Sequence, residues 1–600
     1  GTYYQNAGFT MNFESNFQAY IDALDNFQNH GAIVFAITND TTFSNIDVSA
    51  GLPELFPKLA EAWIAVGNTE VLGASGNHTY VRKGGICGDA AEYCLQADGF
   101  EIFSVANTSS GTSYNQGVTD VDQSTKKSGT SFAAPQVSGA IAILSEAFPS
   151  ASPAQLVDRL LASADNSFFT ATGNTTFSNG VTHGYHSTWG HGMLDIYAAL
   201  QPITTSRMGR SILVGSSTQD SKIYSLERSN IKVPRLFGDV FEKNFINTKG
   251  VFHDAMYGTF NYDYSQSFLR EKDLNMKEKL ENHFSSNKSI YSTQRTGLKT
   301  NLISRYNSSP LNKVYEPEFF FKSNLTPTRG IINSYNLPLE ITSGFISTND
   351  KITSRGFNDG FNVPFLPKIT SDSNNTHSYS SGIFLDDLNN SSISLFYNEN
   401  EKGINTNGAL LKTDLIGSSL LLGYSNEDQG FLGATSEGAF EKSQSTPTNF
   451  LGHSINKKIS DKLSFSSLIS VGHTNMRGFE NTLISDIDDI YSSSWGTNFT
   501  YQTNDRDTLS LSFSQPHRVE KGNANILVPK VHNLNGTLNY DKRKINLQPS
   551  GRETNFSIRL DKQLSEYSSA SIENILTKDY MHNSDNGLDN TLFLSFKSVF

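Results

Sequence analysis

The feature that most constrains the fold is a series of short alternating segments between residues 326 and 600. Residues 509–513 read Leu-Ser-Leu-Ser-Phe, and Phe556, Ile558 and Leu560 lie at every second position. This period of two is typical of β-strands that have one apolar and one polar face. Strands of about ten residues with an apolar outer face and a polar inner face are what a transmembrane β-barrel requires. We therefore expect an antiparallel transmembrane β-barrel over residues 326–600, with repeated soluble β-sandwiches as the alternative.

The end of the chain continues this pattern. Leu592, Leu594 and Phe596 fall on one face of the last segment, and the chain finishes at Phe600. A final strand with a terminal aromatic residue is typical of outer-membrane barrels. Ser598 departs from that pattern, which prefers an apolar or aromatic side chain at this position.

Residues 1–203 have a different character, because apolar strand-like runs alternate with helical patterns. Residues 32–37 and 63–66 are apolar runs of strand length. Residues 152–155, Ser-Pro-Ala-Gln, supply an N-cap, a first-turn proline and a capping-box glutamine for a helix. Such alternation predicts an α/β domain with a mostly parallel sheet.

The charge is unevenly distributed and supports a boundary near residue 200. Residues 1–200 hold 18 Asp and Glu against 6 Lys and Arg, a balance of −12, which equals the net charge of the whole chain. The remaining residues therefore balance at 41 of each sign (59 − 18 and 47 − 6). We expect a connector over residues 204–325, which contains the charged stretch 270–281 and is partly helical. Since no basic stripe with interleaved aromatic residues is present, nothing indicates a nucleic-acid partner.

Cys87 and Cys94 are the two cysteines of the chain. Two close cysteines favour one local disulfide in an oxidising compartment, which would contribute about 2–3 kcal/mol. A metal site is the alternative, but no second Cys or His pair accompanies them at a suitable spacing. We expect no metal and no cofactor. No apolar run reaches the 18 residues that a transmembrane helix needs, and no signal peptide is visible.

Residues 128–144 contain the chemically most informative segment. Gly129 and Thr130 precede Ser131, and small residues then begin a helix. A hydroxyl at this place lies among unpaired N–H groups and near the positive end of the helix dipole, where a developing oxyanion is stabilised. Pro135 is expected to be tolerated as a first-turn residue. The alternative is a core helix of small residues.

The Gly-Thr-Ser-Phe-Ala-Ala-Pro sequence at 129–135 resembles the nucleophile segment of subtilisin-like serine peptidases. The whole chain looks like a subtilase autotransporter, with a passenger (1–203), a connector (204–325) and a translocator barrel (326–600). This resemblance implies that Ser131 is the nucleophile. Residues 31–39 resemble the strand that leads to the oxyanion-hole asparagine, so Asn39 would donate its amide to the tetrahedral intermediate.

Four further segments resemble parts of this family. Residues 87–103 are similar to the disulfide loop of such passengers. Residues 234–239 and 251–254 resemble the region that precedes the barrel. Residues 545–553 look like the penultimate-strand signature of the barrel.

The catalytic triad is incomplete in the sequence. A subtilase uses Asp, His and Ser in this order, and both partners normally precede the oxyanion asparagine. The stretch before Asn39 holds one histidine, His30, which begins the strand leading to Asn39 and cannot also serve as the base. The remaining candidates are expected to be solvated or loop residues: Asp22, Asp25, His183, His186 and His191.

We expect an amino-terminally truncated peptidase whose missing part carries the triad Asp and His; a truncated pseudopeptidase is the alternative. The expected function is that of a serine endopeptidase, displayed on or released from the outer membrane by its own barrel. Its partners would be protein or peptide substrates, outer-membrane lipid and the barrel-assembly machinery. The alternative function is an inactive or adhesive passenger on a working barrel.

Overall fold

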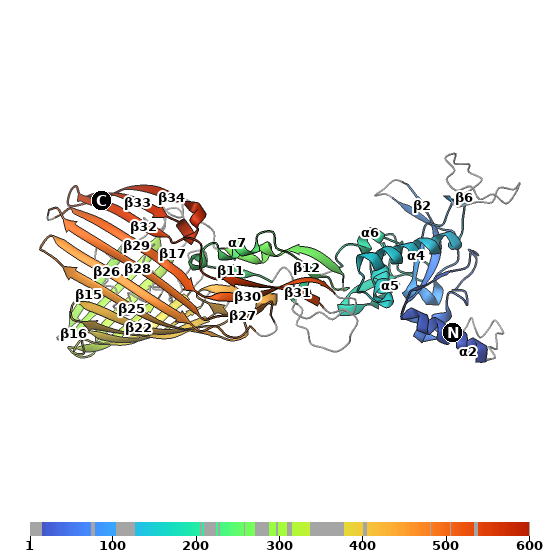
Figure 1. The fold of residues 1–600 in the computed structure, drawn as a ribbon, viewed down its shortest axis with the longest axis horizontal. Helices are drawn as coiled ribbons and strands as arrows, with labels where there is room; N and C mark the ends of the chain where they lie inside the picture. Colours follow the sequence, from blue (N-terminus) through green and yellow to red (C-terminus); the bar gives the residue numbers. More distant parts are fainter. Residues whose placement is uncertain are drawn as a thin grey trace. The chain divides into compact units, whose positions relative to one another are not determined.

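A computed structural model gives the fold in two compact units (Figure 1). The amino-terminal unit contains residues 1–227, 250–262 and 529–540, and the carboxyl-terminal unit contains residues 228–249, 263–528 and 541–600. The structure describes residues 15–73, 78–103, 126–203, 207–208, 224–225, 229–256, 258–270, 287–295, 298–308, 315–335, 377–399, 405–479, 482–504, 506–532 and 538–598.

The amino-terminal unit is an α/β domain, as the sequence predicts. Strand β2 (Trp63–Leu72) lies at the centre of its sheet, pairs in parallel with β1 (Ile33–Ala36) and β4 (Cys94–Ala97), and pairs antiparallel with β3 (Thr79–Arg82). The other elements are α2 (Ser15–Gln28), α3 (Leu52–Leu55), η1 (Pro57–Ala60), η2 (Gly88–Tyr93), β5 (Ile102–Phe103), β6 (Lys126–Lys127), α4 (Thr130–Ala147), α5 (Pro153–Ala162), β7 (Gly173–Thr176), η4 (Ser178–Gly180), β8 (Thr182–Tyr185), α6 (Ile196–Ala199), β9 (Arg207–Met208), β10 (Tyr224–Ser225), β12 (Lys249–His253) and β13 (Thr259–Asp263).

Helices α4 and α5 form as their local sequences predict, with one correction. Ser152 and Gln155 make the reciprocal capping box that begins α5. Pro135, however, is the sixth residue of α4 and does not lie in its first turn. It therefore removes the N–H that the Ser131 carbonyl would otherwise accept four residues along the helix.

A 15-stranded antiparallel sheet dominates the carboxyl-terminal unit. Its strands follow one another across the sheet in the order of the chain, as in a meander. In order across the sheet they are β15 (Asn287–Arg295), β16 (Leu298–Ser308), β17 (Tyr315–Asn324), β18 (Arg329–Tyr335), β19 (His377–Leu385), β20 (Ser391–Glu399), β21 (Asn405–Leu415), β22 (Ser418–Glu427), β25 (Thr446–Lys458), β26 (Leu463–Thr474), β28 (Ile490–Gln502), β29 (Thr508–Lys521), β32 (Thr554–Gln563), β33 (Ser568–Lys578) and β34 (Leu588–Ser598).

The two faces of this sheet have inverted polarity. One face exposes large apolar side chains, among them Leu395 (64%) and Ile469 (51%). The residues opposite them on adjacent strands are often apolar as well. The other face buries polar side chains, such as Ser470 (1% exposed) and Glu573 (4%). Such an arrangement is the reverse of a soluble protein, in which the apolar face is covered.

The connections at the two ends of the sheet differ. Short turns join strands at one end, for example residues 416–417 between β21 and β22. The connections at the other end are longer and contain their own elements: β23 (Gly430–Phe431), β24 (Ala434–Ser436), η7 (Gly438–Phe440), β27 (Ile484–Ile487), β30 (Asn523–His532), β31 (Leu538–Asn546), η8 (Tyr580–His582) and η9 (Ser584–Asn586).

Several sequence expectations can be compared with this sheet. Strands β15 to β17 lie within the expected connector, so residue 326 falls inside the sheet, between β17 and β18. Residues 545–553 precede β32, which is third from the end of the sheet and not its penultimate strand. Ser598 ends β34, whereas Phe600 and residues 271–286 lie outside the described residues. None of the described helices combines the length and apolar character that a membrane crossing needs.

Candidate active site

The carboxyl ends of the parallel strands meet at the beginning of α4. Asn39 follows β1, and Asn68 of β2 lies opposite Ala97, the last residue of β4. The buried Asn68 side chain accepts a hydrogen bond from the Gly99 N–H (3.0 Å), and the Gly99 carbonyl accepts one from the Gly129 N–H (2.9 Å). A Cβ on Gly99 would lie 2.5 Å from the Gly129 carbonyl oxygen, so only glycine permits this approach.

Asn39 is fixed against the start of α4 by its side-chain oxygen. The Oδ1 atom accepts hydrogen bonds from the Thr130 N–H (2.8 Å) and the Thr130 hydroxyl (3.1 Å). Because a backbone N–H can only donate, the atom that faces it must be the oxygen, and this assigns the amide orientation. The Nδ2 group thus keeps its two protons for another acceptor.

Ser131 is the second residue of α4, and its side chain is exposed. An N–H in the first turn of a helix has no partner four residues earlier. The Thr130 N–H is bound by Asn39, and the Phe132 N–H donates to the Gly129 carbonyl (2.9 Å). Between them, the Ser131 N–H has no hydrogen bond within the described part of the chain. An acceptor beside Ser131 could therefore receive N–H groups from both Ser131 and Asn39.

None of the candidate Asp and His residues named from the sequence lies beside Ser131 as a triad partner. His30 is exposed just beyond the end of α2, at the amino end of β1, whereas Asn39 follows the carboxyl end of this strand. Asp22 and Asp25 lie within α2 and form exposed ion pairs with Lys58 (2.7 and 3.2 Å).

Of the three later histidines, His186 and His191 lie in the loop between β8 and α6, as the sequence suggests, whereas His183 lies in a strand. His183 lies in β8, and its Nδ1 is 3.0 Å from Nδ1 of His191. The His191 side chain is fully buried, and burial lowers its pKa to about 4; burial also lowers the pKa of His183. His186 accepts a hydrogen bond from the Thr188 N–H (3.0 Å). No solvent surrounds His191, because a tertiary fold packs it against η2, which the sequence pattern does not reveal.

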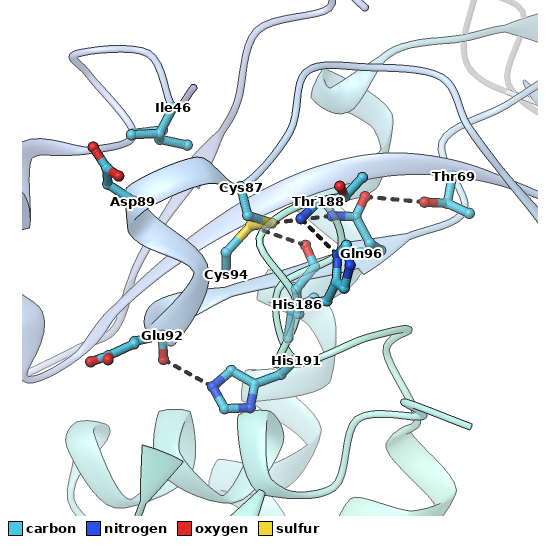
Figure 2. Close-up of a disulfide and its surroundings, with 12 residues drawn as sticks. Ile46, Thr69, Cys87, Asp89, Glu92, Cys94, Gln96, His186, Thr188 and His191 are labelled. Carbon is cyan, nitrogen blue, oxygen red and sulfur yellow. Dashed lines mark hydrogen bonds between the residues drawn. A yellow bond between two sulfur atoms is a disulfide. The ribbon is translucent and has the colours of Figure 1, made fainter. Parts of the chain in front are cut away.

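The disulfide expected from the sequence is present and lies near His186 and His191 (Figure 2). Cys87 and Cys94 are joined at an S–S distance of 2.07 Å, and both are fully buried. The His191 N–H donates to the Cys94 carbonyl (2.8 Å), and Nε2 of His191 lies 3.0 Å from the Glu92 carbonyl. The bridge thus closes the loop around η2, and these two contacts of His191 connect that loop to the segment after β8.

Asn68 is the site residue that the sequence analysis missed. Its role depends on the Gly99 N–H, which is 31 residues away along the chain, so no local pattern identifies it. Among the described residues, no group of three or more His, Cys, Asp and Glu side chains is arranged to hold a metal ion.

Residues 6–192 match the Subtilase family. This segment, which contains Ser131 and Asn39, is therefore subtilisin-like. An extracellular serine protease of Serratia marcescens is 31% identical over 137 residues, which are 21% of this chain. The chain spans only 13% of the length of that relative.

Solved structures of outer-membrane proteins resemble the carboxyl-terminal half at low similarity. They include the outer-membrane protein OmpT of Vibrio cholerae (9% identity, TM-score 0.30, 52% of this chain and 88% of that chain). An anion-selective porin from Comamonas acidovorans is 11% identical, with a TM-score of 0.30 and coverage of 52% and 88%. TM-scores this low do not establish a common fold.

Proposed function

We propose that the chain is part of a subtilisin-like serine endopeptidase, displayed at or released from the outer membrane by its own β-barrel. Ser131 attacks the scissile carbonyl and forms the acyl-enzyme, while Asn39 and the Ser131 N–H stabilise the oxyanion. The observation that carries this proposal is the Asn39–Thr130 hydrogen bond of 2.8 Å, which holds the asparagine beside the Ser131 N–H. The triad Asp and His come from sequence outside this chain, so the chain by itself has little activity.

Replacement of Ser131 by alanine tests the nucleophile. In a longer gene product that supplies the triad Asp and His, Ser131→Ala should abolish hydrolysis of a fluorogenic peptide and labelling by a fluorophosphonate. Ser138→Ala is the matched control, because Ser138 is exposed on the same helix and its hydroxyl bonds only the Ala134 carbonyl (3.2 Å). Retained cleavage by the Ser131 variant would overturn the assignment.

The barrel part of the proposal rests on the inverted polarity of the large sheet. Exposed apolar residues pair across strands, as Ile383 with Ile393 and Ile572 with Leu594. On the opposite face, Arg559 and Glu573 form a buried ion pair (2.9 Å). Water does not favour an apolar outer surface on this scale, whereas lipid does. Closure of the sheet between β15 and β34 is part of the proposal.

Tyrosines near the long-connection end of the sheet support a membrane position. Tyr335, Tyr379, Tyr397, Tyr424 and Tyr491 lie near that end of five strands. The rings of Tyr335 and Tyr379 are 5.0 Å apart, and Tyr379 pairs with Tyr397 across two strands. Such aromatic girdles are typical of the boundary between lipid and headgroups.

The alternative is an inactive or adhesive passenger on a working barrel. The absence of the triad Asp and His from this sequence favours it. The hydrolysis assay separates the two functions: a longer product that reaches the membrane and still cleaves no peptide would be a display module.

A further inference from the structure

Two motifs that the active site does not use contact each other in the carboxyl-terminal unit. Residues 234–239 and 545–553 are separated by about half the chain, yet Nε of Arg235 donates to Glu553 (3.0 Å). The Ser550 N–H donates to Asp239 (3.0 Å). Glu553 is fully buried and Asp239 is 1% exposed, so these charges are desolvated and depend on their partners.

The backbone of this region also joins distant parts of the chain. Strand β11 (Ile231–Val233) pairs in parallel with β14 (Phe268–Arg270) and antiparallel with β24, opposite Thr435 and Ser436. The Glu437 N–H continues this ladder by donating to the Asn230 carbonyl (2.9 Å). We call residues 229–249 and 263–270 the clasp; it also contains η5 (Arg235–Phe237), α7 (Val240–Phe245) and η6 (Tyr264–Ser267).

A cluster of phenylalanines fills the space between the clasp and the long connections. The ring of Phe268 lies 4.0 Å from Phe245 and 5.6 Å from Phe440, and Phe237 lies 5.7 Å from Phe431. Phe237, Phe245, Phe431 and Phe440 are each at most 1% exposed. Burial of one such ring contributes about 1.5–3 kcal/mol, so the cluster is a small hydrophobic core in its own right.

Gly238 shows how closely the clasp approaches the connections. Its φ is +52°, and a Cβ would lie 2.8 Å from the Pro549 side chain and 3.0 Å from the Met581 carbonyl oxygen. Figure 1 shows α7 and β11 just beyond one end of the large sheet. The long connections of the sheet lie at this same end. The clasp therefore contacts three separate connections, which hold residues 430–440, 549–553 and 580–585.

We infer that the contacts between the clasp and the long connections keep residues 1–270 associated with the rest of the chain when the covalent link between them is cut. The covalent path from the clasp to the sheet runs through residues 271–286, whereas the contacts described above between the clasp and the connections are all made to residues beyond 429. A chain cut between Arg270 and Asn287 keeps its two pieces together, because the β-ladder, the buried ion pair and the phenylalanine core all bridge the cut. The inference goes beyond the proposed function and does not depend on peptidase activity.

The test is a cut at a chosen place. The recognition sequence of a site-specific protease is inserted between residues 270 and 287 of the full chain, and the purified protein is cut to completion. The fragments 1–270 and 271–600 should co-elute in size-exclusion chromatography without denaturant and separate in urea. Separate elution without denaturant would overturn the inference. Hydrolysis of peptides is not measured, so this outcome and that of the Ser131 test are independent.

Variants identify the holding contacts. Combined Arg235→Ala and Asp239→Ala substitutions, and separately Phe245→Asp, should cause loss of co-elution after the cut while the uncut proteins elute as the wild type. The control is Arg329→Ala, which breaks an exposed ion pair with Asp387 (2.8 Å) at a short turn and should leave co-elution unchanged. Full retention in both clasp variants would show that other contacts hold the fragments and would overturn the role of the clasp.

Discussion

At the scale of single residues, Asn39 has two roles, and each role uses a different atom of its side chain. The oxygen of Asn39 holds the start of α4 through Thr130, while its Nδ2 group is left as a donor. One side chain thus positions the helix and also presents a proton to the place where an oxyanion would develop. These roles can be tested separately, because they use different atoms.

Asn39→Asp should keep the acceptor for the Thr130 N–H and lose the donor. In the longer, active product we expect kcat to fall by about 10²–10³, with little change in the thermal unfolding midpoint. Asn39→Ala, which loses both atoms, should lower kcat and the unfolding midpoint. Normal kcat in the aspartate variant would contradict the oxyanion role.

A buried ion pair connects α5 to residues 251–254, the second motif of the connector. Arg159 (1% exposed) contacts Asp254 at 2.8 Å and donates to the carbonyls of Ala199 and Gln201. Asp254→Ala leaves this guanidinium buried without its counter-charge and should lower the free energy of unfolding by about 3–5 kcal/mol. Asp22→Ala removes an ion pair with Lys58 that solvent screens, and it should change the free energy of unfolding far less. If a urea titration gave equal changes for the Asp254 and Asp22 variants, burial of the ion pair would not account for the larger cost.

At the scale of elements, some short segments contact parts of the chain that are distant in sequence. Element η8 is one of these segments. His582 is fully buried there; its Nδ1 accepts from the Glu553 N–H (3.0 Å), and its Nε2 lies 2.9 Å from the His517 carbonyl. Protonation of Nδ1 would break the first of these bonds. The charged groups that face His582 are Glu553, Arg235 and Arg518.

Burial lowers the pKa of His582 from 6.5 to about 4, with Glu553 opposing this shift. The unfolded chain therefore binds a proton more readily than the folded one between these values. The neutral His582 contributes roughly 3 kcal/mol to the free energy of unfolding. This contribution is fully present above pH 6.5 and is lost as the pH falls toward 4. We expect the unfolding midpoint of the wild type to fall over this range, and His582→Gln to show a smaller slope. If the unfolding midpoint of His582→Gln depended on pH as steeply as that of the wild type, His582 would not be a source of this pH dependence.

At the scale of the whole molecule, the inverted polarity of the sheet makes a prediction about depth in a membrane. Ile469 is 51% exposed in the middle of β26, and Ile459 is 52% exposed beside a short turn. Ile469→Arg should cost about 2–4 kcal/mol in phospholipid vesicles, and Ile459→Arg about 0–1 kcal/mol. The measurement is reversible unfolding in urea. Equal, small costs would mean that this face does not meet lipid.

The sequence by itself determined what depends on neighbours along the chain. The α/β character of the amino-terminal unit, the capping of α5, the pairing of Cys87 with Cys94 and the alternation in β29 and β32 all arise from local spacing. Strands β15 to β17 were expected to be connector because their apolar residues alternate less regularly, so only pairing with β18 reveals them.

The tertiary structure alone decided the contacts between residues far apart in sequence. Asn68 reaches Gly99, His191 becomes buried against η2, and Arg235 meets Glu553 across more than 300 residues. Local propensities contain no information on these distances, because the contacts form only when whole strands and connections pack. The sequence thus specified the elements and the serine, and packing decided what surrounds them.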